Sequence, residues 1–181
     1  MRKNVVKEEL KAGQAVVGVF CNLPSPAAVE MLGLMGYDFA IIDAEHGPMD
    51  LETCEHMARA ADAANLVPIV RVALNLPQNV LRYLDAGALG VQIPMVNTRE
   101  EAERVVASTK YPPLGRRGLA GTRASGFGAG MDLAEYVRMA NEETLVVVQV
   151  ETREALANLE EIAAVELVDV VFLGPTDLSM A

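Results

Sequence analysis

Residues 145–151 read LVVVQVE, a run of β-branched side chains that closes on Gln149 and Glu151. Apolar runs of this length are typical of strands that a parallel sheet buries on both faces. Similar runs recur along the chain, and we expect strands at residues 15–21, 39–43, 68–72, 90–94, 145–150 and 168–173. Amphipathic stretches separate them, which indicates repeated β-α units around one parallel sheet.

Helix signals lie between the expected strands. Ser25 followed by Pro26 predicts an N-cap and a first helical position, and Gly36 is a plausible stop. Thr98 with Glu101 predicts a capping box at the start of another helix. A further stretch carries an apolar stripe at helical spacing, formed by Leu51, Cys54, Met57, Ala58, Ala61 and Ala64.

This alternation predicts an α/β fold, and we expect a (β/α)8 TIM barrel of which about six strands are present. The length of 181 residues suits one compact domain, so we assign residues 1–181 to a single barrel domain. A closed barrel of eight strands takes about 250 residues. Because six parallel strands leave two unpaired edges, we expect a domain truncated at its C-terminus rather than a naturally shortened one.

Composition excludes several functional classes. The net charge is -10, tryptophan is absent and no basic cluster interrupts the acidic balance, so nucleic-acid binding is not expected. No run approaches the ~20 apolar residues that cross a bilayer, and the charged N-terminal segment lacks a signal-peptide core. We therefore expect no membrane association and a cytoplasmic location. Cys21 and Cys54 have no metal-ligand spacing, and both are predicted to be buried thiols.

The segment at residues 111–130 interrupts the β-α pattern with the sequence YPPLGRRGLAGTRASGFGAG. Connections of this length in compact domains are often functional loops. A surface excursion or a subunit contact explains the same composition equally well. The three arginines of this segment, Arg116, Arg117 and Arg123, are candidates for selecting the substrate, as are segments beyond this chain or a neighbouring subunit.

Polar side chains gather at the ends of the expected strands. In a parallel barrel these ends meet on one face, where catalytic groups collect. The residues at this rim are Asp43, Glu45, His46, Arg71, Gln149, Glu151 and Asp177. Glu151 and Asp177 offer hard oxygen ligands from neighbouring strands, which suit Mg²⁺ or Mn²⁺, with other divalent ions possible.

Each of these residues also has a structural interpretation. Glu151 and Asp177 are possible helix caps, and Arg71 could form a salt bridge with Asp43. The imidazole of His46 could be a hydrogen-bonded loop residue instead of a group poised near neutral pH. The chain's other histidine, His56, lies opposite an apolar stripe, so we expect it at the surface.

Six segments resemble the HpcH/HpaI aldolase/citrate lyase family in order and spacing. They are IIDAEHGPMD, VPIVRV, YLDAGALGVQIPMV, YPPLGRRG, VVVQVET and FLGPTDLS, and the resemblance runs from about Gly18 to the last residue. It implies a barrel of the phosphoenolpyruvate/pyruvate type. It also implies a class II pyruvate aldolase that reversibly cleaves a 4-hydroxy-2-oxo acid to pyruvate and an aldehyde through a metal-bound enolate.

The same resemblance implies roles for individual residues. Glu151 and Asp177 match the metal ligands, His46 the general base and Arg71 the residue that stabilises the transition state. The remaining matched positions are Gln149 as a substrate contact, backbone groups at Gly174, Thr176 and Asp177 that receive the pyruvyl carboxylate, and Asp85 as an acid that supports the histidine. Alanine is common in the family where Thr176 stands here. Our own assignment puts Asp85 at a helix end on the face opposite His46.

The resemblance further implies a divalent cation, Mg²⁺ or Mn²⁺ with Co²⁺ or Zn²⁺ possible, and a homo-oligomer, either a trimer or a hexamer. Two alternatives stay open. One is a lyase of the same family that cleaves malyl-CoA or a citryl substrate. The other is a non-catalytic, incomplete barrel that serves as an assembly module.

Overall fold

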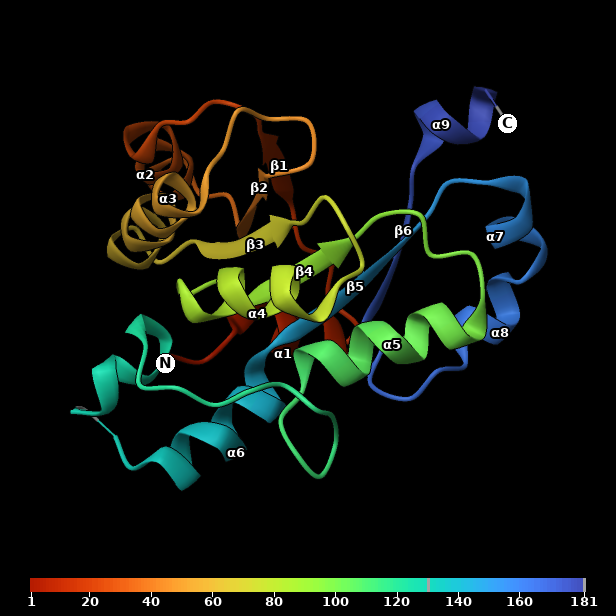
Figure 1. Cartoon of the computed structure of the whole chain (residues 1–181). Coiled ribbons are helices and arrows are strands. Elements are labelled where there is room, and N and C mark those ends of the chain that lie inside the picture. The colour runs from red at the N-terminus through yellow and green to blue at the C-terminus, as the bar shows by residue number, and fades with distance from the viewer. Residues whose placement is uncertain (130, 181) are drawn as a thin grey trace.

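The chain forms a six-stranded, all-parallel sheet in a computed structural model, which describes residues 1–129 and 131–180. The strands pair in chain order and are β1 (Gly18–Cys21), β2 (Phe39–Asp43), β3 (Val67–Arg71), β4 (Gly90–Ile93), β5 (Leu145–Val150) and β6 (Val170–Leu173). Figure 1 shows the sheet curling between its helices. The curled sheet is a half-barrel, which confirms the expected α/β barrel architecture.

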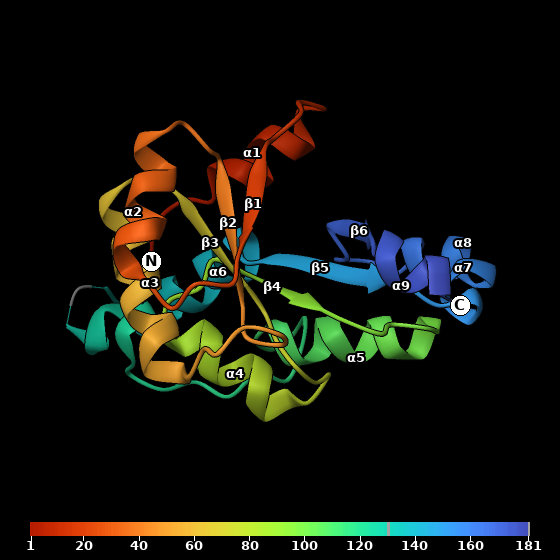
Figure 2. The same ribbon diagram turned by 90° about the horizontal axis from the view of Figure 1, so that it is seen from above.

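Helices connect the strands. They are α1 (Val5–Lys11), α2 (Pro26–Leu34), α3 (Leu51–Ala63), α4 (Pro77–Asp85), α5 (Arg99–Thr109), α6 (Leu133–Glu143), α7 (Arg153–Ala157), α8 (Leu159–Ala163) and α9 (Pro175–Met180), with a 3₁₀ segment η1 (Arg123–Gly128) before α6. Figure 2 shows α2 to α5 along the outer side of the sheet, and α1 on the other side. No helix within the described residues is long and apolar enough to cross a membrane.

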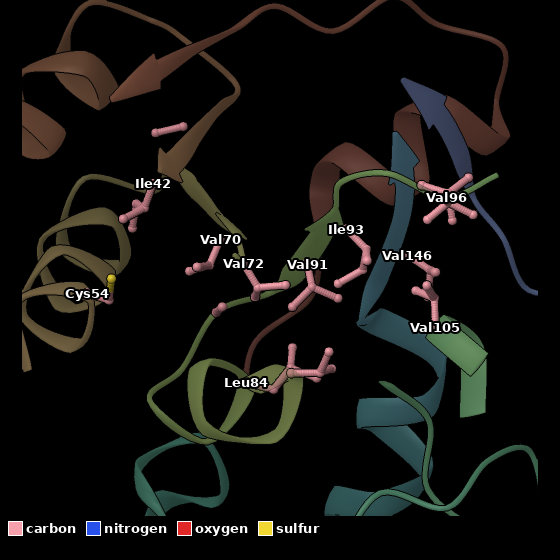
Figure 3. Close-up of a cluster of buried hydrophobic side chains, with 14 of the residues drawn as sticks. Ile42, Cys54, Val70, Val72, Leu84, Val91, Ile93, Val96, Val105 and Val146 are labelled. Atoms are coloured by element: carbon pink, nitrogen blue, oxygen red, sulfur yellow. The ribbon is translucent and has the colours of Figure 1, made fainter. Parts of the chain in front are cut away.

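The convex side of the sheet packs against these outer helices. Figure 3 shows the contact, with side chains of neighbouring strands facing Cys54 on α3, Leu84 on α4 and Val105 on α5. The apolar stripe of α3 is confirmed, because Cys54, Met57, Ala58 and Ala61 are buried. Both cysteines are buried free thiols, as expected.

The concave side has an apolar layer that is covered by α1. Ile41, Ile69 and Val147 alternate with the outward residues of their strands and cluster with Val6 of α1. Two residues further along β2 and β3, the inward-facing side chains are the polar Asp43 and Arg71. The apolar layer therefore supports a polar layer at the carboxyl ends of the strands.

Helix starts follow the sequence signals closely. The Ser25 side chain accepts a hydrogen bond from the Ala28 N–H at 3.3 Å, and Pro26 is the first residue of α2. Thr98 caps α5 through the Glu101 N–H, also at 3.3 Å. The reciprocal half of the capping box differs, because the Glu101 carboxylate accepts from the N–H of Asn97 instead.

Two strands begin later than the sequence predicts. β1 begins at Gly18 rather than at residue 15, because ladder pairing with β2 starts there and the Val17 N–H donates to the Asp38 carboxylate. β6 begins at Val170 rather than at residue 168. Leu167 has a φ of 71° in the preceding turn, so the chain becomes extended only afterwards.

Candidate active site

Asp43 and Arg71 form the centre of the polar layer. They are register partners on β2 and β3, and two hydrogen bonds join them, Nε to Oδ1 at 2.9 Å and Nη2 to Oδ2 at 2.7 Å. The Asp43 side chain is fully buried. Burial raises the pKa of Asp43, but hydrogen bonds and the charge of Arg71 outweigh that effect, so the pKa lies below its ordinary value. The salt bridge considered from the sequence is therefore present.

The guanidinium of Arg71 is held on several sides. Its Cζ lies 4.8 Å from the centre of the Phe20 ring, and its Nε lies 3.3 Å from Oε2 of Glu45. Burial lowers the pKa of Arg71, but the neighbouring carboxylates raise it by more. The pKa therefore lies above its ordinary value, and the group keeps its charge. A fixed cation of this kind is suited to an anionic oxygen at the rim.

Asp43 also shapes the turn that carries His46. Its Oδ1 accepts hydrogen bonds from the N–H groups of Glu45 and His46, each at 3.2 Å. Its Oδ2 accepts from the side-chain amide of Asn22 at 2.7 Å. One buried carboxylate thus connects the end of β1, the end of β3 and the turn after β2.

The side chains of Glu45 and His46 extend from this turn into different environments. The His46 side chain is 65% exposed, and its Nε2 lies 3.9 Å from Oε2 of Glu45. That Glu45 oxygen is buried and has no hydrogen-bond partner within the described part of the chain. Burial is the main reason that the pKa of Glu45 is raised, while the charges of Arg71 and His46 lower it and those of Glu151 and Asp43 raise it. Glu45 is thus a largely buried carboxylate that pairs with Arg71.

Glu151 is fixed by two donors. Its Oε1 accepts from the N–H of Met95 at 2.8 Å, and its Oε2 accepts from the side-chain amide of Gln149. The amide oxygen of Gln149 in turn accepts from Gln92, so a buried chain of polar side chains joins β4 to β5. Glu151 is not the cap of the next helix, since Thr152 caps α7.

Asp177 comes from the neighbouring strand end. It lies in the first turn of α9, two positions past the helix start, so it is not the N-cap. Gly174 joins β6 to α9, and a Cβ added there would lie 2.9 Å from Oε2 of Glu151. A cavity of about 350 Å³ opens here, lined by Phe20, Asn22, Arg71, Gln149, Phe172, Gly174, Pro175, Thr176 and Asp177.

One expected backbone donor has another partner. The N–H of Gly174 donates to the Val150 carbonyl at 3.0 Å, because β5 and β6 are still paired at that point. Within this chain the Gly174 N–H is therefore occupied, while Gly174 still lines the cavity and its lack of a Cβ makes room for Glu151. The N–H groups of Thr176 and Asp177 belong to the first turn of α9, where a helix offers no internal acceptor.

The residues present fit a divalent cation. Glu151 and Asp177 supply hard carboxylate oxygens at neighbouring strand ends, and Oε2 of Glu45, 3.3 Å from Nε of Arg71, is a buried acceptor without a hydrogen bond among the described residues. Among residues 1–129 and 131–180, no group of three or more His, Cys, Asp or Glu side chains is placed to hold a metal ion alone. Two carboxylates that leave positions for water or substrate are typical of magnesium sites.

Other residues predicted for the site lie elsewhere. Asp85, at the end of α4, accepts a hydrogen bond from Arg117 at 2.7 Å and is not brought to His46 within this chain. Arg123 donates to Asp62 at 2.5 Å. These groups lie where the strands begin, as the position of Asp85 in the sequence indicates. His56 is exposed, as expected.

The structure adds four residues that sequence reasoning missed. Phe20 and Asn22 contact the Arg71 and Asp43 pair, while Gln92 and Met95 hold Gln149 and Glu151. Asn22 directly follows a strand, so its position alone is a signal. The other three are recognisable only once the strands are placed side by side.

Comparisons with known proteins place the chain in a family. A family model described as HpcH/HpaI aldolase/citrate lyase matches residues 16–181. A pyruvate aldolase of Rhizobium etli is 41% identical over 177 residues, which are 97% of this chain and 68% of that protein. A 5-keto-4-deoxy-D-glucarate aldolase of Shigella boydii serotype 18 is 40% identical over 179 residues, covering 98% of this chain and 68% of that protein.

A solved structure is similar along the same length. It is a HpcH/HpaI aldolase/citrate lyase family protein from Burkholderia cenocepacia J2315, with a TM-score of 0.92 and 38% sequence identity. The alignment covers 98% of this chain and 71% of that one. The sequence segments, the half-barrel and the rim of polar side chains thus lead to one conclusion: this chain belongs to the HpcH/HpaI aldolase/citrate lyase family.

Proposed function

We propose that this chain reversibly cleaves a 4-hydroxy-2-oxo acid to pyruvate and an aldehyde, with a divalent cation held by Glu151 and Asp177. The observation that carries the proposal is the fixed carboxylate of Glu151. Met95 and Gln149 hold this carboxylate, and it packs against Gly174, where a Cβ would clash with it. Gly174 lies three residues before Asp177, so the two carboxylates come from neighbouring strand ends. Relatives named as aldolases support a carbon-carbon lyase.

The substrate's carboxylate and keto group would enter the cavity between Gln149, Arg71 and the first turn of α9. The N–H groups of Thr176 and Asp177 are suited to the carboxylate. When bound, the cation supplies a Lewis acid that polarises the keto oxygen. Gln149 holds Glu151 in place and also reaches the cavity, so it aligns a ligand with the carboxylate.

Two side chains of the chain would perform the charge and proton steps. Arg71, oriented by its two bonds to Asp43, stabilises the negative oxygen that develops as the C3–C4 bond breaks. His46 takes the proton of the 4-hydroxyl group, and general bases of this kind contribute about 10²- to 10⁴-fold in rate. Its exposed imidazole, anchored through the backbone N–H to Asp43, is accessible to that proton.

The test is pyruvate release from a 4-hydroxy-2-oxo acid. We expect activity that requires Mg²⁺ or Mn²⁺, that EDTA removes, and that Glu151→Gln removes as well. Glu154→Gln is the matched control, because Glu154 is an exposed acid in the first turn of α7. Undiminished activity with EDTA or in Glu151→Gln would reject the metal-dependent mechanism.

The same preparation separates the alternatives. Release of CoA from malyl-CoA without cleavage of hydroxy-oxo acids would instead favour the thioester lyases of the family. A folded chain that binds Mn²⁺ and pyruvate but turns over neither substrate would favour the non-catalytic reading. Sedimentation of the chain tests the predicted trimer or hexamer. Because Asp85 is not brought to His46 within one chain, it would have to come from a neighbouring subunit, and activity that requires assembly would support that role.

A further inference from the structure

A second cavity lies at the end of the sheet opposite the candidate active site. Its volume is about 310 Å³, and it is lined by Arg2, Arg117, Arg123, Asp62 and Thr144 among others. Figure 1 shows this region at the lower left, where the N-terminus and α6 meet, away from α9 at the upper right. Three arginines around one cavity are unusual in a chain whose net charge is -10.

The positive charges of this cavity are only partly neutralised. Asp62 is shared, since it accepts from Nε of Arg2 at 3.0 Å and from Nη2 of Arg123 at 2.5 Å. Asp85 pairs with Arg117. Among these five side chains, three guanidinium groups therefore pair with two carboxylates, an excess of one positive charge.

Two residues that line the cavity each have a buried polar atom without a partner among the described residues. Arg117 is 5% exposed, and its Nε donor has no hydrogen-bond partner within residues 1–129 and 131–180. Thr144 is fully buried, and its hydroxyl likewise has no hydrogen-bond partner among the described residues. Buried donors that lack acceptors are unfavourable, so each calls for a partner such as a ligand or an ordered water.

The arginines also retain donors. A guanidinium carries five N–H groups in a planar fork. Arg2 donates to Asp62 and to the Leu66 carbonyl, and Arg123 donates to Asp62 and to the Ala86 carbonyl. Each side chain is thus fixed by two partners while further N–H groups remain, which is the arrangement that binds planar or tetrahedral oxyanions.

We propose that this cavity is a binding site for a small oxyanion, a carboxylate or a phosphate, that is separate from the candidate active site. The ligand accepts hydrogen bonds from Arg117 and Thr144 and neutralises the excess charge of Arg2 and Arg123. A volume of about 310 Å³ matches the lower end of known ligand sites, so the ligand is a compact anion and not a nucleotide. Bound there, it links α3, the turn before β4, η1 and the turn before β5.

The test is calorimetric titration of the EDTA-treated, full 181-residue chain with inorganic phosphate and, separately, with malonate. Removing divalent cations keeps anions from binding through a metal at the other rim. We expect saturable binding with one site per chain and a dissociation constant of about 1 mM or tighter for at least one of the two anions. Tighter phosphate binding identifies the ligand as a phosphate, and tighter malonate binding identifies a carboxylate. Thermal unfolding should shift upward with the same concentration dependence.

Two variants and one control locate the binding. Thr144→Val keeps the side-chain shape and removes only the unpartnered hydroxyl, so it should fold and bind the anion several-fold more weakly. Arg123→Gln removes one charge and should weaken binding about tenfold or more. Arg59→Gln on α3 is the control, because Arg59 pairs with Glu55 on the helix surface, and it should bind as the unaltered chain does.

Two results would overturn the proposal. One is the absence of saturable binding of either anion to the folded, unaltered chain, which would mean that ordered water fills the cavity. The other is binding that Thr144→Val and Arg123→Gln leave unchanged while circular dichroism shows both variants folded. Either result leaves the proposed aldolase activity to its own test, because pyruvate release is measured separately from anion binding.

Discussion

Asp43 and Arg71 face each other across β2 and β3 and are joined by two hydrogen bonds, while Asp43 also holds the turn that carries His46. The carboxylate thus connects the two groups assigned to charge stabilisation and proton transfer. Because one side chain serves both, a change at Asp43 should affect stability and catalysis together. A change at Arg71 alone should mainly affect charge stabilisation, and a change at His46 alone should mainly affect proton transfer.

Asp43→Asn is the first prediction. The variant removes the carboxylate that accepts two hydrogen bonds from the buried Arg71 and leaves Glu45 as its remaining ion-pair partner, and breaking a buried ion pair costs about 3–5 kcal/mol. We expect the free energy of unfolding to fall by that amount in urea denaturation. Glu55→Gln, which breaks the exposed pair with Arg59, should cost below about 1 kcal/mol. Equal losses in the two variants would show that the Asp43 pair is not the buried centre that the geometry indicates.

Gly174→Ala tests the space beside Glu151. The new Cβ would lie 2.9 Å from both Cβ and Oε2 of Glu151, so the carboxylate has to move. Displacing a carboxylate or its support typically lowers metal affinity 10- to 100-fold. We expect a loss in that range in a Mn²⁺ titration followed by electron paramagnetic resonance, with pyruvate release falling in parallel.

Gly118→Ala is the matched control for that experiment. An added Cβ at Gly118 makes only an ordinary contact with Leu81 at 3.9 Å. Its Mn²⁺ affinity should therefore equal that of the unaltered chain. If Gly174→Ala binds Mn²⁺ as well as Gly118→Ala does, Glu151 is not a ligand in the position that the structure gives it.

The sequence predicts the strands well because burial on both faces requires apolar runs, and β2 and β5 have the expected bounds. The bounds of β1 and β6 depend on where a neighbour begins to pair, which one strand's composition does not contain. Arg71 has the same limit: an arginine at a strand end predicts an anion, but only the register identifies Asp43.

The candidate site is predictable in its location and less so in its contacts. Strand ends mark the rim, yet the chain of bonds from Gln92 through Gln149 to Glu151 depends on the order of strands. At the opposite end of the barrel, the contact of Arg117 is not predictable from the sequence. The long segment that carries it has no periodic pattern, so only tertiary contacts show that it pairs with Asp85.

Lys110 gives a prediction about pH. It is fully buried, and its Nζ donates to the carbonyls of Asn141 at 2.8 Å and Thr144 at 2.7 Å. Burial and the nearby charge of Lys7 lower its pKa to about 7. An unfolded lysine keeps its proton up to about pH 10.4. Between these values the unfolded chain binds more protons, so stability should rise with pH, by up to about 1.4 kcal/mol per pH unit from this group.

The measurement is urea unfolding at pH values from 6 to 9. Below pH 7 the folded chain carries the buried charge and its full cost, and above it the cost declines. Lys110→Met has no such group, so its stability should lack this rise. Lys11→Met, at the exposed end of α1, should retain it. A rise of equal slope in Lys110→Met and the unaltered chain would assign the effect to other groups.

Met95 gives the last prediction, because its backbone conformation and its contact with Glu151 are linked. Its φ is 55°, a left-handed value that costs a residue with a Cβ about 1–2 kcal/mol, and in this conformation its N–H donates to Oε1 of Glu151 at 2.8 Å. The side chain itself is largely exposed. Met95→Gly removes the strain and keeps the donor, so Mn²⁺ affinity should persist while stability is unchanged or rises. Met95→Val is β-branched, disfavours this conformation and should weaken both, as measured by urea unfolding and Mn²⁺ titration. If the glycine variant loses Mn²⁺ affinity and the valine variant retains it, the N–H of residue 95 does not hold the carboxylate that we propose as a metal ligand.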